Sequence, residues 1–479
     1  MQRWSKAVAS LSAAALLAAC AVGGGPAAPE QRARNVILFL GDGMGVSTVT
    51  AGRILAGQLQ GGPGEDHTLS FERFPHVALV KTYNTDAQVA DSAGTMSAIM
   101  TGVKTRIGHI SVPPAVAHGD CAAALDNALP TLLELAEQRG LATGVVSTTR
   151  ITHATPAATY AHAPNRDWES DGQLPEAARQ AGCRDIARQL AEFAHGDGIE
   201  VVLGGGRLAF LPAGTADPEY AAASGVRADG RNLIEAWQSA AEGRQYVWNR
   251  AQFDALAAAD GDQVLGLFEP SHMRFEADRA DDAAGEPSLS EMTAFAIDKL
   301  AARGSGYFLM VEGGRIDHAH HAGNAYRALH DLLAFDAAVD TARRMTDAAD
   351  TLIVVTADHS HTFTISGYPR RGNPILGKVE TPLGTQATDA EGRPYTTLGY
   401  ANGPGHQTPL PDLTGTDTTH PDYRQLATVP LDSETHGGED VAAYADGPGA
   451  QGVGGVMEQN RLFDVMHTAL FGATEDGGR

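Results

Sequence analysis

The sequence predicts an α/β protein: a doubly wound, mainly parallel central sheet with helices on both faces. Short apolar runs alternate with longer stretches of helical periodicity, which is the pattern typical of such a sheet. Carboxylate and imidazole side chains follow directly after several of these runs, where the functional residues of open α/β sheets gather. The runs that we expect to be buried strands are 36–40, 144–147, 201–203, 307–311 and 352–356, and the helix candidates between them are 129–139, 291–302 and 325–345.

The chain of 479 residues opens with two basic residues and an apolar stretch, 7–19. This stretch is too short to span a bilayer and predicts a signal peptide over 1–19. It ends in Leu-Ala-Ala-Cys, which resembles a bacterial lipoprotein cleavage box with Cys20 as the lipidated first residue; ordinary secretion is the alternative. Residues 20–34 would form a flexible tether. We therefore expect an exported protein, periplasmic or at the cell surface, attached to the membrane only through lipid on Cys20.

If Cys20 carries lipid, Cys121 and Cys183 are the cysteines that remain. In an oxidising compartment we expect them to form one disulfide. Two free buried thiols are the alternative, and the sequence alone does not decide between them.

The formal net charge of −23 at pH 7 argues against nucleic-acid binding. An acidic surface also repels small anions, so chemistry on a phosphate would need a strong local positive centre.

Residues 367–430 break the alternation of apolar runs and helices. This segment is rich in Gly, Pro, Thr and Asp, and it is too long for a plain loop. We expect a surface insertion with a fold of its own, because the chain returns afterwards to a candidate functional residue, His436.

Potential metal ligands cluster where the predicted strands end. Asp42 follows the first run between two glycines, although Gly-Asp-Gly alone is more often a turn. Glu312 ends the run 307–311, and Asp317 and His321 follow it four residues apart, which on a helix places both on one face.

Two further ligand candidates, Asp358 and His359, end the run 352–356, and His436 comes later in the chain. His436 taken alone would more often be an ordinary surface or core histidine. Carboxylates and imidazoles without thiolates suit zinc with magnesium and argue against copper or iron–sulfur sites.

Ser92 is the candidate nucleophile. The segment Asp91-Ser92-Ala93-Gly94-Thr95 is typical of a capped helix start. A serine in that first turn would face free backbone N–H groups, a favourable place for an anionic phosphate. The alternative is that Ser92 only caps the helix.

At this point the residues resemble the alkaline phosphatase family from about Asn35 to the C-terminus. The motifs that carry the resemblance are, in order, GDGMG, DSAGT, TRITHATPAA, YAHAPNRDW, VEGGRIDHAHH, TADHSH and ETHGGEDVAAYADGP. The resemblance implies one catalytic domain over 35–479, with 367–430 inserted into it. It also implies metal-dependent hydrolysis of phosphate monoesters, through a phosphoserine at Ser92, by a homodimer that places the insertion at its interface.

The resemblance also assigns ligands for two zinc ions and one magnesium ion per subunit. His153 would lie close to the magnesium, and Arg166 would grip the phosphate. The first zinc set is Asp317, His321 and His436; the second is Asp42, Asp358 and His359 with Ser92; the magnesium set is Asp42, Thr155 and Glu312.

Some bacterial relatives have Asp and Lys where this chain has His153 and His318, which puts tight magnesium retention in doubt. The resemblance leaves open a fourth ion, calcium. Its ligands would be Glu219, the Phe268 carbonyl, Glu269 and Glu286.

Three other functions were weighed against this one. Sulfatases modify a nucleophile in a Cys/Ser-x-Pro-x-Arg context, which Ser92 lacks. Phosphodiesterases of the same superfamily usually carry a threonine nucleophile and lack a counterpart of Arg166. A lipid-anchored binding protein without catalysis is disfavoured because every expected catalytic position is filled.

Overall fold

The computed structural model describes residues 32–259 and 261–472. The predicted signal peptide, Cys20 and most of the predicted tether lie outside the described residues. Within the described part of the chain, no helix combines the length and the apolar character that a membrane span requires.

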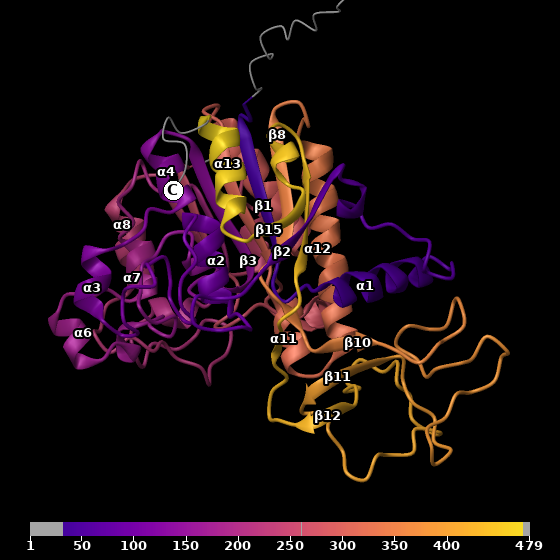
Figure 1. Ribbon diagram of the computed structural model, residues 1–479. Coiled ribbons are helices and arrows are strands. Elements are labelled where there is room, and N and C mark those ends of the chain that lie inside the picture. The colour runs from indigo at the N-terminus through magenta and orange to yellow at the C-terminus, as the bar shows by residue number, and fades with distance from the viewer. Residues whose placement is uncertain (1–31, 260, 473–479) are drawn as a thin grey trace, which may run out of the picture. The chain divides into compact units, whose positions relative to one another are not determined.

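The fold is organised around a ten-stranded sheet in the order β15-β2-β14-β8-β1-β7-β3-β4-β6-β5 (Figure 1). Its strands pair in parallel except β14, which runs antiparallel to both β2 and β8. The strands are β1 (Asn35–Gly41), β2 (His76–Lys81), β3 (Ala142–Arg150), β4 (Val201–Gly205), β5 (Arg244–Val247), β6 (Gln263–Leu267), β7 (Tyr307–Gly313), β8 (Thr351–Ala357), β14 (Val441–Asp446) and β15 (Gly455–Glu458).

Helices cover both faces of this sheet. α10 and α12 pack together on one face, and α2, α4 and α13 lie on the other (Figure 1). The helices are α1 (Val46–Leu59), α2 (Ser92–Thr101), α3 (Cys121–Asp126), α4 (Leu132–Gln138), α5 (Ala154–Ala157), α6 (Glu176–Gln180), α7 (Ile186–Ala191), α8 (Leu233–Ala240), α9 (Arg250–Asp254), α10 (Leu289–Ala302), α11 (Arg315–His321), α12 (Ala325–Met345) and α13 (Arg461–Phe471).

The central strands read as continuous apolar runs because both of their faces are covered. Every residue of β1, β7 and β8 is buried. Phe39 of β1 meets Phe335 of α12 edge to face, with ring centroids 5.9 Å apart, which fixes this helix on the sheet. The doubly wound α/β prediction is confirmed, and all five predicted strands are present.

The sequence did not predict strands β2, β5, β6, β14 and β15, which lie toward the two edges of the sheet. β14 is built mainly of alanine, a weak strand former, and Val77 and Leu79 of β2 point outward and are exposed. Their pairing depends on chain segments that meet only in the folded protein.

The predicted disulfide between Cys121 and Cys183 is present. The two Cα atoms lie 5.9 Å apart, and the bond closes a sequence separation of 62 residues. It links the start of α3 to the segment that leads into α7.

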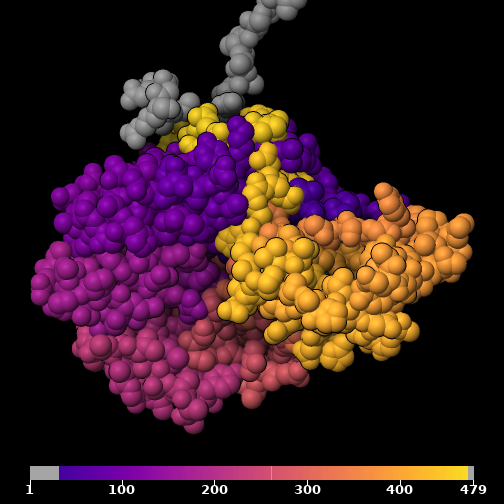
Figure 2. Space-filling model, turned by 60° about the horizontal axis from the view of Figure 1, so that its bottom comes forward, coloured from indigo at the N-terminus to yellow at the C-terminus, as the bar shows by residue number. Residues whose placement is uncertain are grey.

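The inserted segment 367–430 contributes to a small sheet of its own, with the order β10-β11-β12. Two of its strands, β11 (Leu398–Gly403) and β12 (Ala427–Pro430), lie inside the segment, whereas β10 (Phe363–Ile365) precedes it. Phe363 and Leu398 form a separate apolar cluster with Leu55 of α1. Figure 2 shows the orange residues of this region as one continuous area of the surface.

Candidate metal centre

The candidate centre lies where four neighbouring parallel strands, β8, β1, β7 and β3, end at one edge of the sheet. Gly41 of β1 pairs with Ala357 of β8, so the next residues, Asp42 and Asp358, emerge side by side. Glu312 pairs with the residue before Gly41 and joins them from β7. Strand register therefore brings together three carboxylates that are far apart in the sequence.

Asp317, His321 and His436 form the first group. Asp317 Oδ1 lies 3.3 Å from His321 Nε2 and 3.4 Å from His436 Nε2, and the two imidazole nitrogens are 3.1 Å apart. Asp317 and His321 both belong to α11, so the expected pairing on one helix face is confirmed. The two-stranded pairing of β13 (His436–Gly437) with β9 (Ser360–His361) brings His436 to them.

Asp42, Asp358 and His359 form the second group. His359 Nε2 lies 3.2 Å from Asp358 Oδ2 and 3.4 Å from Asp42 Oδ1. The backbone N–H of Gly43 donates to Asp358 Oδ1 at 3.0 Å. Gly43 adopts a φ of +69°, and a Cβ there would lie 2.3 Å from His361 Nε2, so glycine is required on both grounds.

A third group shares Asp42 with the second. The possible ligand atoms of Asp42, His153 and Glu312 all lie within 4.8 Å of one another. Thr155 Oγ1 lies 3.5 Å from Asp42 Oδ2. A hydrogen bond from the Thr149 hydroxyl to Glu312 Oε2, at 3.1 Å, orients the Glu312 carboxylate.

The three imidazoles of the first two groups share one orientation. In each ring, Nδ1 faces a backbone carbonyl and Nε2 points inward toward the carboxylates. The Nδ1–oxygen distances are 2.5 Å for His321 to Glu434, 2.7 Å for His436 to Ala90 and 3.2 Å for His359 to Ser360. A carbonyl at Nδ1 fixes the tautomer that leaves Nε2 free to bind a metal.

Ser92 is the first residue of α2 and lies beside these groups. Its Oγ is 3.2 Å from His359 Nε2 and 3.5 Å from Asp42 Oδ1, and the residue is 2% exposed. The helix cap is Asp91, whose side chain accepts from Gly94 N at 3.0 Å. Capping is therefore done by the neighbour, and the Ser92 hydroxyl faces the centre.

Arg166 is held next to Ser92 by the same cap residue. Its Nη1 donates to Asp91 Oδ2 at 3.0 Å, and its Nη2 lies 3.1 Å from His153 Nε2. The Asp91 carboxylate thus both caps the N-terminus of α2 and positions the Arg166 guanidinium. The arrangement suits an anion lying between Ser92 and Arg166.

The centre concentrates negative charge away from water. Asp42, Glu312, Asp317 and Asp358 are each at most 4% exposed. Burial, reinforced by the charges of Asp358, Asp317 and Glu312, raises the pKa of Asp42 well above its ordinary value, and burial raises that of Glu312 to about 7. Burial opposes ionisation of Asp317 as well, but neighbouring histidines, His321 first, hold its pKa low.

Two of these carboxylates have an oxygen without a hydrogen-bond partner in the described part of the chain. They are Asp358 Oδ2 and Glu312 Oε1, and both atoms are buried. A buried carboxylate oxygen with no partner is costly unless a cation or donor compensates for it. Divalent cations bound by oxygen and imidazole nitrogen would do so, and the donor set fits zinc and magnesium.

Sequence reasoning did not assign roles to His361 and Glu434. His361 Nε2 lies 2.9 Å from Asp317 Oδ1, and its Nδ1 lies 2.5 Å from Glu434 Oε2. Although burial opposes its charge, the hydrogen bonds to these two carboxylates raise the pKa of His361 to about 9. The only clue in the sequence to a role for His361 is its position directly after His359 and Ser360. In the folded chain His361 orients Asp317.

The residues expected to bind calcium are only partly brought together. Glu219 and Glu269 lie within 4.8 Å of each other by their carboxylate oxygens, and the third member of that group is Asp282. Glu286 does not belong to that group; its Oε1 accepts from the backbone N–H of Arg274 at 2.9 Å, and its Oε2 is buried without a hydrogen-bond partner among the described residues. Asp282 has no counterpart in the predicted set.

Comparison with known proteins identifies the fold and its chemistry. The family model for alkaline phosphatase matches residues 33–471. The tissue-nonspecific isozyme of alkaline phosphatase from Gallus gallus is 49% identical over 443 residues, covering 91% of this chain and 84% of that protein. The chain belongs to the alkaline phosphatase family. It is a metal-dependent enzyme that hydrolyses phosphate monoesters to an alcohol and inorganic phosphate.

Other members of the alkaline phosphatase family agree with this assignment. The human tissue-nonspecific isozyme is 45% identical over 451 residues, covering 92% of this chain and 84% of that protein. The structure of alkaline phosphatase from Thermus thermophilus superposes with a TM-score of 0.66 at 27% identity, covering 93% of this chain and 92% of that one. Alkaline phosphatase from the Antarctic bacterium TAB5, with a TM-score of 0.62 and 22% identity over 92% of this chain and 100% of that one, shares the fold.

Proposed function

We propose that Ser92 is the nucleophile of this alkaline phosphatase. The observation that carries the proposal is the position of its Oγ, 3.2 Å from His359 Nε2 and 3.5 Å from Asp42 Oδ1 at the start of α2. Ser92 Oγ forms a bond to phosphorus while the ester P–O bond breaks and the alcohol leaves with a proton. Water then cleaves the phosphoserine, which releases inorganic phosphate and regenerates the hydroxyl.

We propose the following ligand sets for the metals of the family. Bound there, divalent ions would offset phosphate charge and lower the pKa of the serine hydroxyl. Arg166 orients two phosphate oxygens, which favours a monoester dianion over a diester. The sets are Asp317, His321 and His436 for one zinc; Asp42, Asp358 and His359 for the other; and Asp42, Thr155 and Glu312, with His153 nearby, for magnesium.

Substitution of Ser92 by alanine tests the nucleophile. Ser92→Ala is expected to lower turnover of p-nitrophenyl phosphate by orders of magnitude while metal content per subunit stays the same. Ser97→Ala is a matched control in α2, because the Ser97 hydroxyl is buried but donates to the His109 carbonyl at 3.0 Å and faces no ligand group. Undiminished hydrolysis by Ser92→Ala would show that another group attacks phosphorus.

We also propose a calcium site formed by Glu219, Glu269 and the Phe268 carbonyl, with either Glu286 or Asp282 as the further carboxylate. Arg207 Nη2 lies 2.8 Å from Glu219 Oε2 and would compete with the ion. A metal assay after mild chelation tests the site, and loss of calcium binding in Asp282→Asn would separate the ligand set that contains Asp282 from the one that contains Glu286.

Two further proposals concern assembly and location. We propose a homodimer that uses the inserted segment 367–430, which sedimentation of the purified protein would test. We propose export and lipid attachment at Cys20, which the intact mass of the mature protein would test. An unmodified Cys20 would rule out the anchor, and a monomer at micromolar concentration would rule out the dimer.

A further inference from the structure

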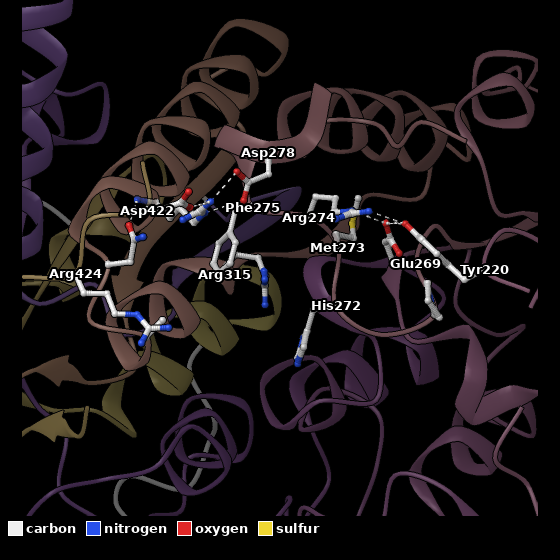
Figure 3. A pocket seen from close by; sticks show the side chains of 14 residues that line it. Tyr220, Glu269, His272, Met273, Arg274, Phe275, Asp278, Arg315, Asp422 and Arg424 are labelled. Carbon is white, nitrogen blue, oxygen red and sulfur yellow. Dashed lines mark hydrogen bonds and ion pairs between the residues drawn. The ribbon is translucent and has the colours of Figure 1, made fainter. Parts of the chain in front are cut away.

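A pocket of about 770 Å³ lies on the other side of α11 from the zinc ligands. Arg315 of α11, Arg424 of the inserted segment and His272, from the loop that follows β6, belong to its lining (Figure 3). On a helix, Arg315 and Asp317 project in nearly opposite directions, since they are two residues apart. The helix that carries Asp317 therefore also forms a wall of this pocket.

The pocket is close to the reaction centre. The ring of His272 lies 4.1 Å from that of His318 and 5.2 Å from that of His153, measured between centroids. His153 in turn lies 3.1 Å from the phosphate-binding guanidinium of Arg166. A molecule that reaches past His272 would thus extend from the centre into the pocket.

The basic side chains that line the pocket outnumber the acidic ones. Arg327 forms ion pairs with Asp278 at 2.7 Å and with Asp422 at 2.9 Å, and Arg274 pairs with Glu269 at 3.2 Å. These contacts account for all the acidic groups of the lining.

Arg315 and Arg424 are left over. Within the described residues, neither forms an ion pair, and Arg315 Nε is buried without a hydrogen-bond partner. Arg315 stacks on Phe275, with its guanidinium carbon 3.8 Å from the ring centroid, which fixes its direction. In Figure 3, Arg315 lies between Arg424 and His272. In a chain of net charge −23, two guanidinium groups in a concave site that form no ion pair with any described residue favour an anion.

We propose that this pocket binds a second anionic group on the leaving group of the substrate, with Arg315 and Arg424 as its donors. The inference rests on the proposed function, because the first phosphate must occupy the centre at Ser92. It predicts a preference for phosphate monoesters whose alcohol carries another phosphate or a carboxylate at some distance.

Linear diol phosphates of increasing length test this preference. For each chain length, kcat/KM is measured for the monophosphate, the bisphosphate and the ω-carboxylate monophosphate. A bisphosphate has two equivalent ends, so a ratio of two over the monophosphate is statistical. We expect a ratio of about tenfold at one optimal length, as charge-assisted contacts supply, and a decrease of this ratio with added salt. The carboxylate series shows whether the site requires a phosphate.

Variants at Arg424 decide the assignment. Arg424→Gln is expected to bring the bisphosphate ratio close to two, and Arg424→Lys to restore part of it. Arg344→Gln is a matched control: this exposed arginine lies on α12 outside the pocket and is expected to keep the wild-type ratio. A wild-type ratio near two at every length, or an unchanged ratio in Arg424→Gln, would overturn the inference. Failure to hydrolyse even the monophosphates would instead overturn the proposed function.

Discussion

Replacing Asp42 by asparagine should have opposite effects on the metal-free and the metal-loaded protein. Asp42 belongs to two ligand groups at once, since its Oδ1 faces His359 and its Oδ2 faces Thr155. Without metals, its carboxylate is buried among other acids, which raises its pKa well above the ordinary value. In the ligand sets proposed above, the same charge would hold two of the ions.

The sign of the effect on the metal-free protein follows from the direction of the pKa shift. A raised carboxyl pKa favours folding fully only below the unfolded pKa, near 3.9, and this contribution is lost as pH rises toward the folded pKa. A buried Asp42 therefore costs the metal-free protein folding stability, and this cost grows as pH rises from the unfolded pKa toward the folded pKa. Asparagine does not titrate and removes this cost.

Denaturant unfolding at pH 5 and pH 7, with and without a chelator, measures how Asp42→Asn changes the unfolding free energy of the metal-free and the metal-loaded protein. We expect Asp42→Asn to stabilise the chelated protein, more at pH 7 than at pH 5, and to destabilise the metal-loaded protein. Metal analysis should show the loss of two ions rather than one. Asp331→Asn is the control: burial raises the pKa of Asp331 to about 8, but the residue lies in α12 outside the ligand groups, so its effect should not depend on the chelator.

A chelated Asp42→Asn variant less stable than the wild type at pH 7 would contradict the raised pKa of Asp42. The ligand sets would be refuted if this variant retained all its metal, because Asp42 would then not be shared between two sites.

Three more results are expected. Arg166→Ala should raise KM and weaken inhibition by inorganic phosphate about tenfold or more, as expected for loss of a charge-assisted contact, while much of kcat remains; steady-state kinetics measure both. Replacing Cys121 and Cys183 together by serine should cost about 4 kcal/mol of unfolding free energy, as loop-closure entropy predicts for a separation of 62 residues, and equal denaturation midpoints would contradict this. Phe335→Ala should cost about 4 kcal/mol, because it removes a fully buried ring that packs on Phe39; thermal unfolding at saturating metal checks it.

Much of the fold could be predicted because the relevant signals are local. A strand buried on both faces is apolar along its whole length, so β1, β7 and β8 stand out in the sequence. The helix α12 spans the predicted residues 325–345, because its periodicity extends over many turns. Strands β2 and β14 also contain short apolar runs, but they are buried only at alternate positions and pair with distant segments, so they do not stand out in the same way.

The candidate site divides in the same way. The spacing of Asp317 and His321 indicates a shared helix face. This relation is readable from the sequence because both residues lie in one short segment. Ser92 was ambiguous between cap and nucleophile until the folded structure assigned the cap to Asp91. The sequence did not indicate Asp282, because its proximity to Glu219 and Glu269 arises only in the folded chain.

The sequence by itself determined the α/β class, the family and the chemical types that surround the reacting phosphate. Short-range periodicity and contiguous motifs carry this information, and both are readable without coordinates. The tertiary structure decided which side chains share a site: Asp42 belongs to two ligand groups, His361 contacts Asp317, and Arg315 lines one pocket with Arg424. These relations join residues that are up to hundreds of positions apart, and strand register and packing, rather than any local pattern, set the distances between them.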